Sequence, residues 1–323
     1  MKKTLVALAL GAGLGLTAFG AAAQQPPLPK TIRLIVAYPA GGVSDVIARA
    51  LGEQLAQQTG STVVVENKAG ASGSIGMDAV AKAPTDGSVL GFSSVSPLVL
   101  NPYLGHSAFD PKKDIAPVAS VMYSPVLLLA TPSEKAADFK ALMGEAKAAP
   151  GTIRWATSGQ GSLGHIMLEQ LKKAAAVDIT HIPYKGGGQQ MNDALGGQFE
   201  VLSTNAGPTV APHIAAGKLR PLAVGASARL ATLPQVPTLA ELGYKSANMS
   251  SQFGVFAPAG MAPALVARYN GEINKALAST GLRARLQVTD NVPTGGSAAD
   301  FGKEIAREYA ANGRILAASG ISK

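Results

Sequence analysis

Arg33-Leu-Ile-Val-Ala-Tyr-Pro-Ala-Gly-Gly-Val-Ser-Asp-Val-Ile-Ala-Arg49 is the stretch that decides the fold, because it holds a strand, a glycine turn and a helix start in one run. Residues 32–37 are almost wholly apolar, which is typical of a strand covered on both faces in a parallel sheet. Pro39 has no amide hydrogen for a sheet ladder, and Gly41 and Gly42 tolerate positive φ angles. The stretch therefore predicts the first βα unit of an α/β protein.

The turn in this stretch leaves backbone N–H groups free at the carboxyl end of a strand. Ser44 or Asp45 can cap the following helix, whose apolar residues include Ile47, Leu51 and Leu55. In open α/β sheets ligands bind at this edge, and an exposed helix amino end favours an anion. An ordinary tight turn without a ligand is the alternative, because such loops are common. The same pattern recurs along the chain, and this repetition favours a binding site.

The first 23 residues have the pattern of a secretory signal peptide. Lys2 and Lys3 are basic, residues 5–16 form an apolar core, and Ala21-Ala22-Ala23 is a typical cleavage site. The apolar core is too short to span a bilayer comfortably. We therefore expect an exported, soluble protein, with residues 1–23 removed.

Composition narrows the function classes further. The chain has no cysteine, so we expect no lipid anchor, no disulfide and no thiolate metal site. Its 28 basic and 20 acidic residues give a formal charge of +8, but they form no basic stripe interleaved with aromatics. Nucleic acid is therefore not an expected partner, whereas a mild positive field that attracts small anions is reasonable.

Strands alternate with helices along most of the chain, which predicts parallel sheets packed between helices. Glycine-rich or hydroxyl-rich turns follow many of the strands and divide into an early and a late set. Two sheets that face each other across a cleft would bring both sets together. The predicted strands are residues 32–37, 62–66, 89–94, 115–121, 125–130, 151–155, 179–184, 199–203, 219–224 and 252–257, and the last helix spans about 298–318.

The run Gly159-Gln-Gly-Ser-Leu-Gly164 satisfies the G-x-G-x-x-G pattern after a strand, so a dinucleotide site has to be considered. The ribose-binding acid should end the next strand, but Tyr184 and Lys185 occupy that position. An exported protein would also have little access to a nicotinamide cofactor. We therefore expect no cofactor.

The residues needed for catalysis or metal binding are scarce. The four histidines, His106, His165, His181 and His213, form no i,i+4 pair and no H-E-x-x-H motif, so we expect no metal. His165 alone lies just inside a candidate anion-binding helix, where it either packs or donates to a ligand oxygen. No G-x-S-x-G motif is present, so we expect no catalytic residue, although a triad assembled from distant residues stays open.

Over essentially the whole expected mature chain, the sequence resembles the Bug-family receptors, the periplasmic substrate-binding components of tripartite tricarboxylate transporters. Five ordered stretches carry the resemblance: Tyr38-Pro-Ala-Gly-Gly-Val-Ser-Asp45, Glu66-Asn-Lys-Ala-Gly-Ala-Ser-Gly-Ser-Ile-Gly76, Ser158-Gly-Gln-Gly-Ser-Leu-Gly-His165, Tyr184-Lys-Gly-Gly-Gly188 and Leu233-Pro-Gln-Val-Pro-Thr-Leu-Ala-Glu-Leu-Gly-Tyr244.

The resemblance implies an α/β, two-domain periplasmic binding protein (type II, Venus flytrap), each domain a mainly parallel sheet flanked by helices. We expect residues 24–126 plus 254–323 to form the first domain and residues 127–253 the second, with crossovers near 125–130 and 251–257. A small organic carboxylate would be held between the lobes, which close around it.

By the same resemblance, the turn from Tyr38 to Asp45 binds one carboxylate through backbone amides and ordered water. Residues 158–162 and 203–208 would contact the ligand from the other lobe. Hydroxyl groups at the end of strand 89–94 and the ring of His165 lie where a ligand is expected. The candidate ligand-binding residues are Tyr38, Ala40, Gly41, Gly42, Ser44, Asp45, Ser93, Ser94, Ser158, Gly159, Gln160, Gly161, Ser162, His165, Thr204, Asn205 and Ala206.

One departure from the family pattern bears on the ligand. Where family members often carry an acidic residue, this chain has Ser203-Thr204-Asn205, so a ligand ammonium would lack its counter-charge. The candidate loops also lack arginine, so helix amino ends and hydroxyls must meet the ligand's charge. The sequence therefore predicts a mono- or dicarboxylate without an amino group, with a dissociation constant on the order of micromolar.

The resemblance implies transporter subunits in the membrane, or a sensor kinase, as partners of a monomeric receptor. Two other classes of function stay open from the residues alone. One is an exported α/β hydrolase acting on carboxylic esters or amides, and the other is a cell-surface adhesion or scaffold module.

Overall fold

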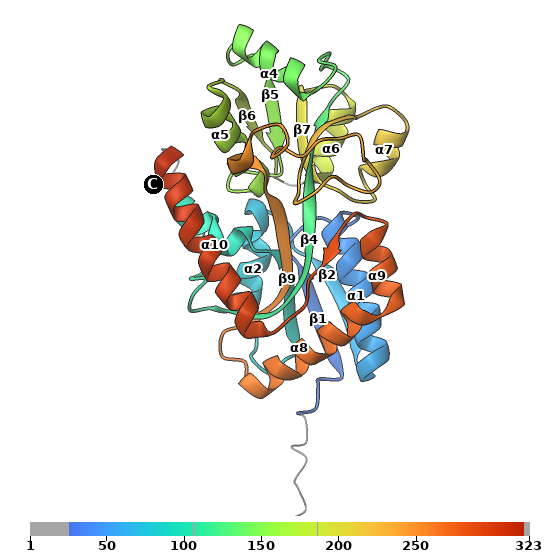
Figure 1. Ribbon diagram of the computed structural model, residues 1–323. Coiled ribbons are helices and arrows are strands. Elements are labelled where there is room, and N and C mark those ends of the chain that lie inside the picture. Colours follow the sequence, from blue (N-terminus) through green and yellow to red (C-terminus); the bar gives the residue numbers. More distant parts are fainter. Residues whose placement is uncertain (1–25, 106, 186, 320–323) are drawn as a thin grey trace, which may run out of the picture.

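The computed structural model describes residues 26–105, 107–185 and 187–319 (Figure 1). The expected signal peptide, residues 1–23, and His106 lie outside the described residues. The strands are β1 (Thr31–Val36), β2 (Thr62–Asn67), β3 (Val89–Ser94), β4 (Ile115–Ala130), β5 (Arg154–Thr157), β6 (Thr180–Pro183), β7 (Val201–Asn205), β8 (Arg220–Gly225), β9 (Ser250–Pro258) and β10 (Val292–Pro293). The helices are α1 (Val43–Thr59), α2 (Ser74–Ala81), α3 (Ser96–Val99), α4 (Phe139–Ala148), α5 (Leu163–Ala175), α6 (Gly187–Leu195), α7 (Ala211–Ala215), α8 (Pro263–Ala278), α9 (Thr280–Gln287) and α10 (Ala298–Ser319), with 3-10 turns η1 (Ala71–Gly73), η2 (Asn101–Leu104) and η3 (Lys245–Ala247).

The strands follow the order β2-β1-β3-β9-β4-β7-β5-β6, with β8 and β10 also paired to β4. The pairs of β1 with β2 and β3, and of β5 with β6 and β7, are parallel, as the βα pattern predicts. The pairs made by β4 and β9 are antiparallel. We term the part built on β1, β2 and β3 the β1 lobe and the part built on β5, β6, β7 and β8 the β5 lobe.

Strand β4 runs through both lobes as one continuous 16-residue strand. The sequence predicts two separate strands here, 115–121 and 125–130, and this prediction is wrong. The ladder with β9 continues through the intervening residues, where Tyr123 pairs with Gln252 and Ser124 with Ser251, so the backbone stays extended. Beyond this point residues 126–130 pair with β7 and β8 of the β5 lobe.

Helices cover both faces of the sheet in the β1 lobe. On β1, Leu34 and Val36 pack toward α1, α8 and α9, whereas Ile35, together with Ala37 directly after the strand, packs toward α2, α3 and α10. All four side chains are buried, as the apolar run predicts. Figure 1 shows α1, α8 and α9 together on one side of this lobe and α2 with α10 on the other.

The β5 lobe has the same layered build on a smaller sheet. Trp155 on β5 is fully buried with residues of α4 and α5, and Leu202 on β7 packs on the opposite side with Phe199. The last helix, α10, begins in the β1 lobe and ends against the other lobe, where Leu316 shares a buried cluster with Ile166 of α5. The predicted final helix is thus confirmed and extends across the seam between the lobes (Figure 1).

Candidate ligand-binding site

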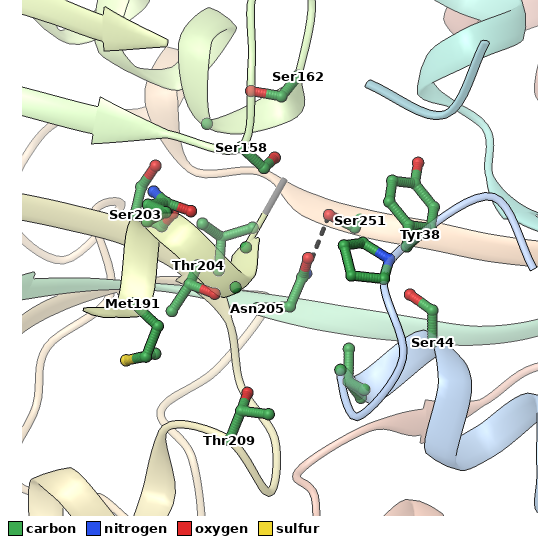
Figure 2. A pocket seen from close by; sticks show the side chains of 18 of the residues that line it. Tyr38, Ser44, Ser158, Ser162, Met191, Ser203, Thr204, Asn205, Thr209 and Ser251 are labelled. Atoms are coloured by element: carbon green, nitrogen blue, oxygen red, sulfur yellow. Dashed lines mark hydrogen bonds between the residues drawn. The ribbon is translucent and has the colours of Figure 1, made fainter. Parts of the chain in front are cut away.

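A cavity of about 570 Å³ lies between the β1 lobe and the β5 lobe. Turns at the carboxyl ends of β1, β3, β5 and β7 form its walls, together with the starts of α1, α5 and α6. This is the edge of an α/β sheet at which ligands bind. Figure 2 shows Tyr38 and Ser44 on one side of the space and Thr204 and Met191 on the other.

Uncharged polar groups dominate the lining. Among the described residues that line the cavity, none is Asp, Glu, Lys or Arg. Hydroxyl groups are abundant instead, because eight serines lie in the walls: Ser44, Ser72, Ser94, Ser96, Ser158, Ser162, Ser203 and Ser251. Within the same described ranges, no three His, Cys, Asp or Glu side chains gather closely enough to hold a metal ion.

The turn before α1 offers backbone N–H groups to the cavity. Gly41 has a φ of 81°, and Gly42 is the N-cap residue of α1 in extended backbone, without a side chain to cap the helix. The first N–H groups of a helix have no intrahelical acceptor, and together they carry a partial positive charge. Because Ala40, Gly42 and Ser44 line the cavity, this end of α1 can bind an anion.

Tyr38 closes the same wall from the end of β1. Its hydroxyl lies 2.6 Å from the Ser94 Oγ, and its ring meets Phe253 edge to face with centroids 6.0 Å apart. Burial raises the pKa of the phenol, although the hydrogen bond to Ser94 opposes this shift, so Tyr38 stays a neutral hydroxyl. Of the two predicted serines on β3, Ser94 lines the cavity, whereas Ser93 is fully buried behind it.

Gly41 and Asp45 lie behind the lining, where they hold the turn in place. The Gly41 N–H donates to the Asp45 Oδ2 at 2.9 Å, and the Asn67 Nδ2 donates to the Asp45 Oδ1 at 2.9 Å and to the Tyr38 carbonyl at 3.0 Å. Burial opposes ionisation of Asp45, but hydrogen bonds from Arg49, Gly41 and Asn67 outweigh it and keep the pKa of the carboxyl below its usual value. The carboxylate of Asp45 is therefore directed to the protein and away from the cavity.

The opposite wall is built by the turn between β5 and α5. Ser158 and Ser162 line the cavity, and Ser162 is the N-cap residue of α5, its Oγ accepting from the His165 N–H. Leu163 and Gly164, in the first turn of α5, also line it. A second helix amino end, from the other lobe, thus opens on the same space.

The predicted residues Gly159, Gln160 and Gly161 lie against the β1 lobe instead of lining the cavity. The Ser72 Oγ donates to the Gln160 carbonyl at 2.8 Å. A Cβ on Gly159 would lie 2.7 Å from the Ser72 Oγ, and one on Gly161 would clash with the side chain of Asn101. Close packing between the lobes therefore explains the first two glycines of the G-x-G-x-x-G pattern, whereas the third, Gly164, packs against Ser203 within the β5 lobe.

His165 also lies behind the lining. Its ring stacks on His181 with centroids 4.1 Å apart, and its Nδ1 accepts from the Gly161 N–H. Burial, reinforced by the charge of Lys172, lowers the pKa of His165 to about 4, and burial together with the neighbouring ring lowers the pKa of His181 to about 3. Both rings are neutral at pH 7 and support the turn before α5.

The end of β7 brings Thr204 and Asn205 to the cavity, whereas the backbone N–H of Ala206 donates to the Pro125 carbonyl and its side chain is buried. The Asn205 Nδ2 donates to the Ser251 Oγ at 3.0 Å (Figure 2). The same nitrogen donates to the Ser124 carbonyl at 3.2 Å. Asn205 therefore links β7 to the two long strands, β4 and β9, and also forms part of the cavity wall.

Nine of the seventeen predicted site residues thus line the cavity, and eight lie behind it. Those in the lining are Tyr38, Ala40, Gly42, Ser44, Ser94, Ser158, Ser162, Thr204 and Asn205. Those behind it are Gly41, Asp45, Ser93, Gly159, Gln160, Gly161, His165 and Ala206.

Sequence reasoning missed lining residues on α6, α7 and β9, including Gln190, Met191, His213, Ser251 and Phe253. The α6 residues lie beyond the glycines that begin the helix, and the β9 residues lie within a strand rather than at its end. Ser72 could have been suspected, because it lies in the glycine-rich turn after β2. The pattern of that turn did not reveal which hydroxyl faces the cavity.

The arrangement is suited to holding an anion through N–H and O–H groups. Among the hydrogen bonds of the described lining residues, no serine hydroxyl is bonded to a histidine ring. The lining therefore supplies hydrogen-bond donors for a bound anion, and the ring of His213, which also lines the cavity, is not bonded to a serine among the described residues.

The model of the tripartite tricarboxylate transporter family receptor matches residues 47–321. The chain belongs to this receptor family. It is 40% identical over 269 residues to the protein BugT of Bordetella pertussis, a match that covers 82% of this chain and 81% of BugT. It is also similar to the solved structure of an R. palustris protein with adipate (30% identity, TM-score 0.85, 90% of this chain and 98% of that one) and to MatC from Rhodopseudomonas palustris with bound malate (26% identity, TM-score 0.80, 88% and 98%).

The receptor has the two-domain α/β fold of periplasmic binding proteins and is of the Bug type, so the fold class and family implied by the sequence are confirmed. Members of this receptor family are solute-binding proteins. Among the helices of the described residues, none combines the length and apolar character needed to cross a membrane.

Proposed function

We propose that this receptor captures a small organic carboxylate without an amino group in the cavity between its two lobes. One observation carries the proposal: the amino ends of α1 and α5, from opposite lobes, both open on a cavity whose described lining holds no Asp, Glu, Lys or Arg. Helix amino ends bind carboxylates through backbone N–H groups and the helix dipole. The eight serines supply further donors.

The solved relatives support the ligand class. Two structures similar to this chain hold adipate and malate, which are both dicarboxylates. A ligand with two carboxylates could place one at each helix amino end, and a ligand with one could place its uncharged part toward Met191 and Phe253. Both kinds fall within the proposal.

The described lining offers no counter-charge for an ammonium group. Thr204 and Asn205 occupy the end of β7, and the Asn205 amide nitrogen already donates to the two long strands. Burying a cation without a partner is costly. An amino acid should therefore bind more weakly than the matching acid without nitrogen. With no guanidinium in the described lining, we expect a dissociation constant on the order of micromolar, or about −8 kcal/mol.

The biological setting forms part of the proposal. We propose an exported periplasmic protein with a cleavable signal peptide at residues 1–23, acting as a monomer without catalysis, and delivering its ligand to membrane transporter subunits or a sensor kinase. We propose lobe boundaries at residues 24–126 plus 254–323 and 127–253, because β4 changes its pairing partners near Val126.

A thermal-shift screen of carboxylates followed by calorimetry tests the proposal. At a hundred times its dissociation constant, a specific ligand should stabilise the protein by about 2.7 kcal/mol. Titration of glutarate against glutamate, and of succinate against aspartate, isolates the amino group. Tighter binding of the amino acid in both pairs would contradict the proposed ligand class.

The same samples test the two alternative functions, a hydrolase and an adhesion or scaffold module. Turnover of a chromogenic ester that disappears with a single Ser→Ala change in the lining would establish a hydrolase instead. An unchanged melting temperature with every carboxylate would favour an adhesion or scaffold module.

A further inference from the structure

Asp45 is the anchor of the anion-binding turn. It is 4% exposed and occupies the third position of α1, and its two oxygens receive the Gly41 N–H and the Asn67 amide. Through Asn67 this network also reaches the Tyr38 carbonyl. The carboxylate therefore fixes the shape of the turn that offers N–H groups to the cavity.

This anchor creates an electrostatic difficulty. Burial opposes the charge of Asp45, but hydrogen bonds from Arg49, Gly41 and Asn67 keep its pKa low, so the carboxyl is ionised at pH 7. Its helix-turn neighbours Gly42 and Ser44 line the cavity that would hold the ligand carboxylate. Two carboxylates at one helix amino end compete for the same positive dipole and repel each other.

Arg49 lies one helical turn further along α1 and resolves this difficulty. Its Nη2 is 2.9 Å from the Asp45 Oδ1 and its Nε is 3.1 Å from the Asp45 Oδ2, so both oxygens are paired. The same guanidinium donates to the Asn67 Oδ1 at 3.1 Å. Arg49 is not among the residues that line the cavity.

We propose that Arg49 sets the affinity of the receptor for its anionic ligand without touching it, by neutralising the Asp45 carboxylate beneath the turn. The buried carboxylate of Asp45 can then hold the turn in shape, while the amino end of α1 still attracts the ligand carboxylate. This inference rests on the proposed function, since it requires an anionic ligand at this turn. Arg49 is a positioning residue that acts through Asp45.

The experiment uses the full mature chain and three probes: adipate, malate and benzoate. The probe that shifts the melting temperature of the wild type most is then titrated by calorimetry against four variants. We expect Arg49→Gln to weaken binding about tenfold, because Asp45 is left uncompensated. Arg49→Lys keeps the charge and should lose less.

The double variant Asp45→Asn/Arg49→Gln gives the decisive result. An asparagine oxygen can still accept from the Gly41 N–H, and no charge remains beneath the turn. We expect its affinity to return to within about twofold of the wild type, a rescue that loss of structure alone would not produce. The deficit of Arg49→Gln should also shrink at about 0.5 M salt, since screening weakens the repulsion.

Arg33→Gln is the matched control. Arg33 pairs with Glu66 through two hydrogen bonds and its side chain is 45% exposed, close to the 47% of Arg49. It lies within β1, however, and is not among the residues that line the cavity. Its variant should bind within twofold of the wild type. If Arg49→Gln binds normally, or if the double variant binds more weakly than Arg49→Gln, the inference is wrong while the proposed function stands. If no acid of the carboxylate screen, these three probes included, binds the wild type, the proposed function fails and the inference fails with it.

Discussion

The Ser72 hydroxyl donates a 2.8 Å hydrogen bond to the Gln160 carbonyl and so joins the β1 lobe to the β5 lobe at the edge of the cavity. Ser72 has a φ of 51°, which a residue other than glycine rarely adopts. Such strain persists where the surrounding structure holds it, and the Asn101 Nδ2 does so here by donating to the Ala71 carbonyl and the Ser74 Oγ. Because Ser72 also lines the cavity, contact between the lobes completes its wall.

Gly159→Ala should weaken ligand binding about tenfold or more. The new Cβ would lie 2.7 Å from the Ser72 Oγ and 3.0 Å from the Tyr184 carbonyl, and Gly159 has a φ of 141° that disfavours any side chain. The lobes would then fail to meet fully. Calorimetry with the best carboxylate and small-angle scattering of the bound form measure the two effects.

Gly144→Ala is the control for this variant. Gly144 lies within α4, and no atom lies within 4 Å of the position that a Cβ would take, so alanine there should stabilise the helix by roughly 0.5–1 kcal/mol. Normal affinity of Gly159→Ala would show that the seam contact does not contribute to binding.

Gly42→Val should abolish most binding and leave the fold intact. A Cβ at this position makes only an ordinary contact, 3.6 Å from the Pro39 carbonyl, and Gly42 has a φ of −71°, so valine introduces no strain. Its branched side chain would cover the N–H groups at the start of α1. We expect an affinity loss above tenfold with a melting temperature within a few degrees of the wild type.

Gly271→Val on α8 is the matched control, since nothing lies within 4 Å of its Cβ. Unchanged affinity in Gly42→Val would place the carboxylate elsewhere in the cavity.

Thr204→Asp should reverse the preference between amino acids and simple acids. Thr204 lies in the cavity wall at the end of β7, where an aspartate would repel a carboxylate and pair with an ammonium. We expect glutarate to bind at least tenfold more weakly, and the glutamate-to-glutarate affinity ratio to rise by a similar factor. Thr204→Asn, which has the same size without the charge, should change the ratio little.

Stability should fall as the pH is lowered from 6.5 toward 4. The pKa of His165 is about 4 and that of His181 about 3 in the folded state, so between these values and 6.5 the unfolded chain binds more protons. Moving from pH 7.5 to pH 5 should lower the free energy of unfolding by roughly 1–2 kcal/mol for each ring. Urea unfolding of the wild type and of His165→Gln/His181→Gln at both values measures the difference.

Protonation of Glu308 on α10 should raise the stability at low pH, opposite to the effect of the two histidines. Burial, together with the nearby Glu304 carboxylate, raises the pKa of Glu308 to about 7, so the folded protein holds a proton that the unfolded chain releases above pH 4.5. Its contribution to stability is present at pH 4.5 and is lost as the pH rises through 7. Glu308→Gln should therefore steepen the loss on acidification, and a shallower profile in this variant would contradict the assignment.

The pattern of residues close together in sequence was sufficient to predict most of the fold. The apolar run of β1 predicts a strand buried on both faces, and the glycines after it predict a turn, because both depend on residues close in sequence. The continuity of β4 could not be read in the same way. Tyr123 and Ser124 stay extended because Gln252 and Ser251 pair with them from a strand more than a hundred residues away.

The site was predictable where a turn faces the cavity and less so where a turn supports it. Tyr38, Gly42 and Ser44 line the space as expected, but Asp45 turns inward because Gly41, Asn67 and Arg49 surround it. The direction of a side chain within a turn depends on tertiary partners. Met191 and Phe253 were missed for the same reason, since only the packing of the lobes brings their elements to the wall.

The two long strands have a mechanical consequence. Ser124 pairs with Ser251 and Pro125 with Ser250, so β4 and β9 lie bonded side by side where they pass from one lobe to the other. A bonded pair of strands resists sliding and yields most easily by flexing out of its own plane. We therefore expect any opening of the cavity to be a swing about a single axis. A transporter subunit that contacts both lobes would then distinguish a loaded receptor from an empty one by one angle.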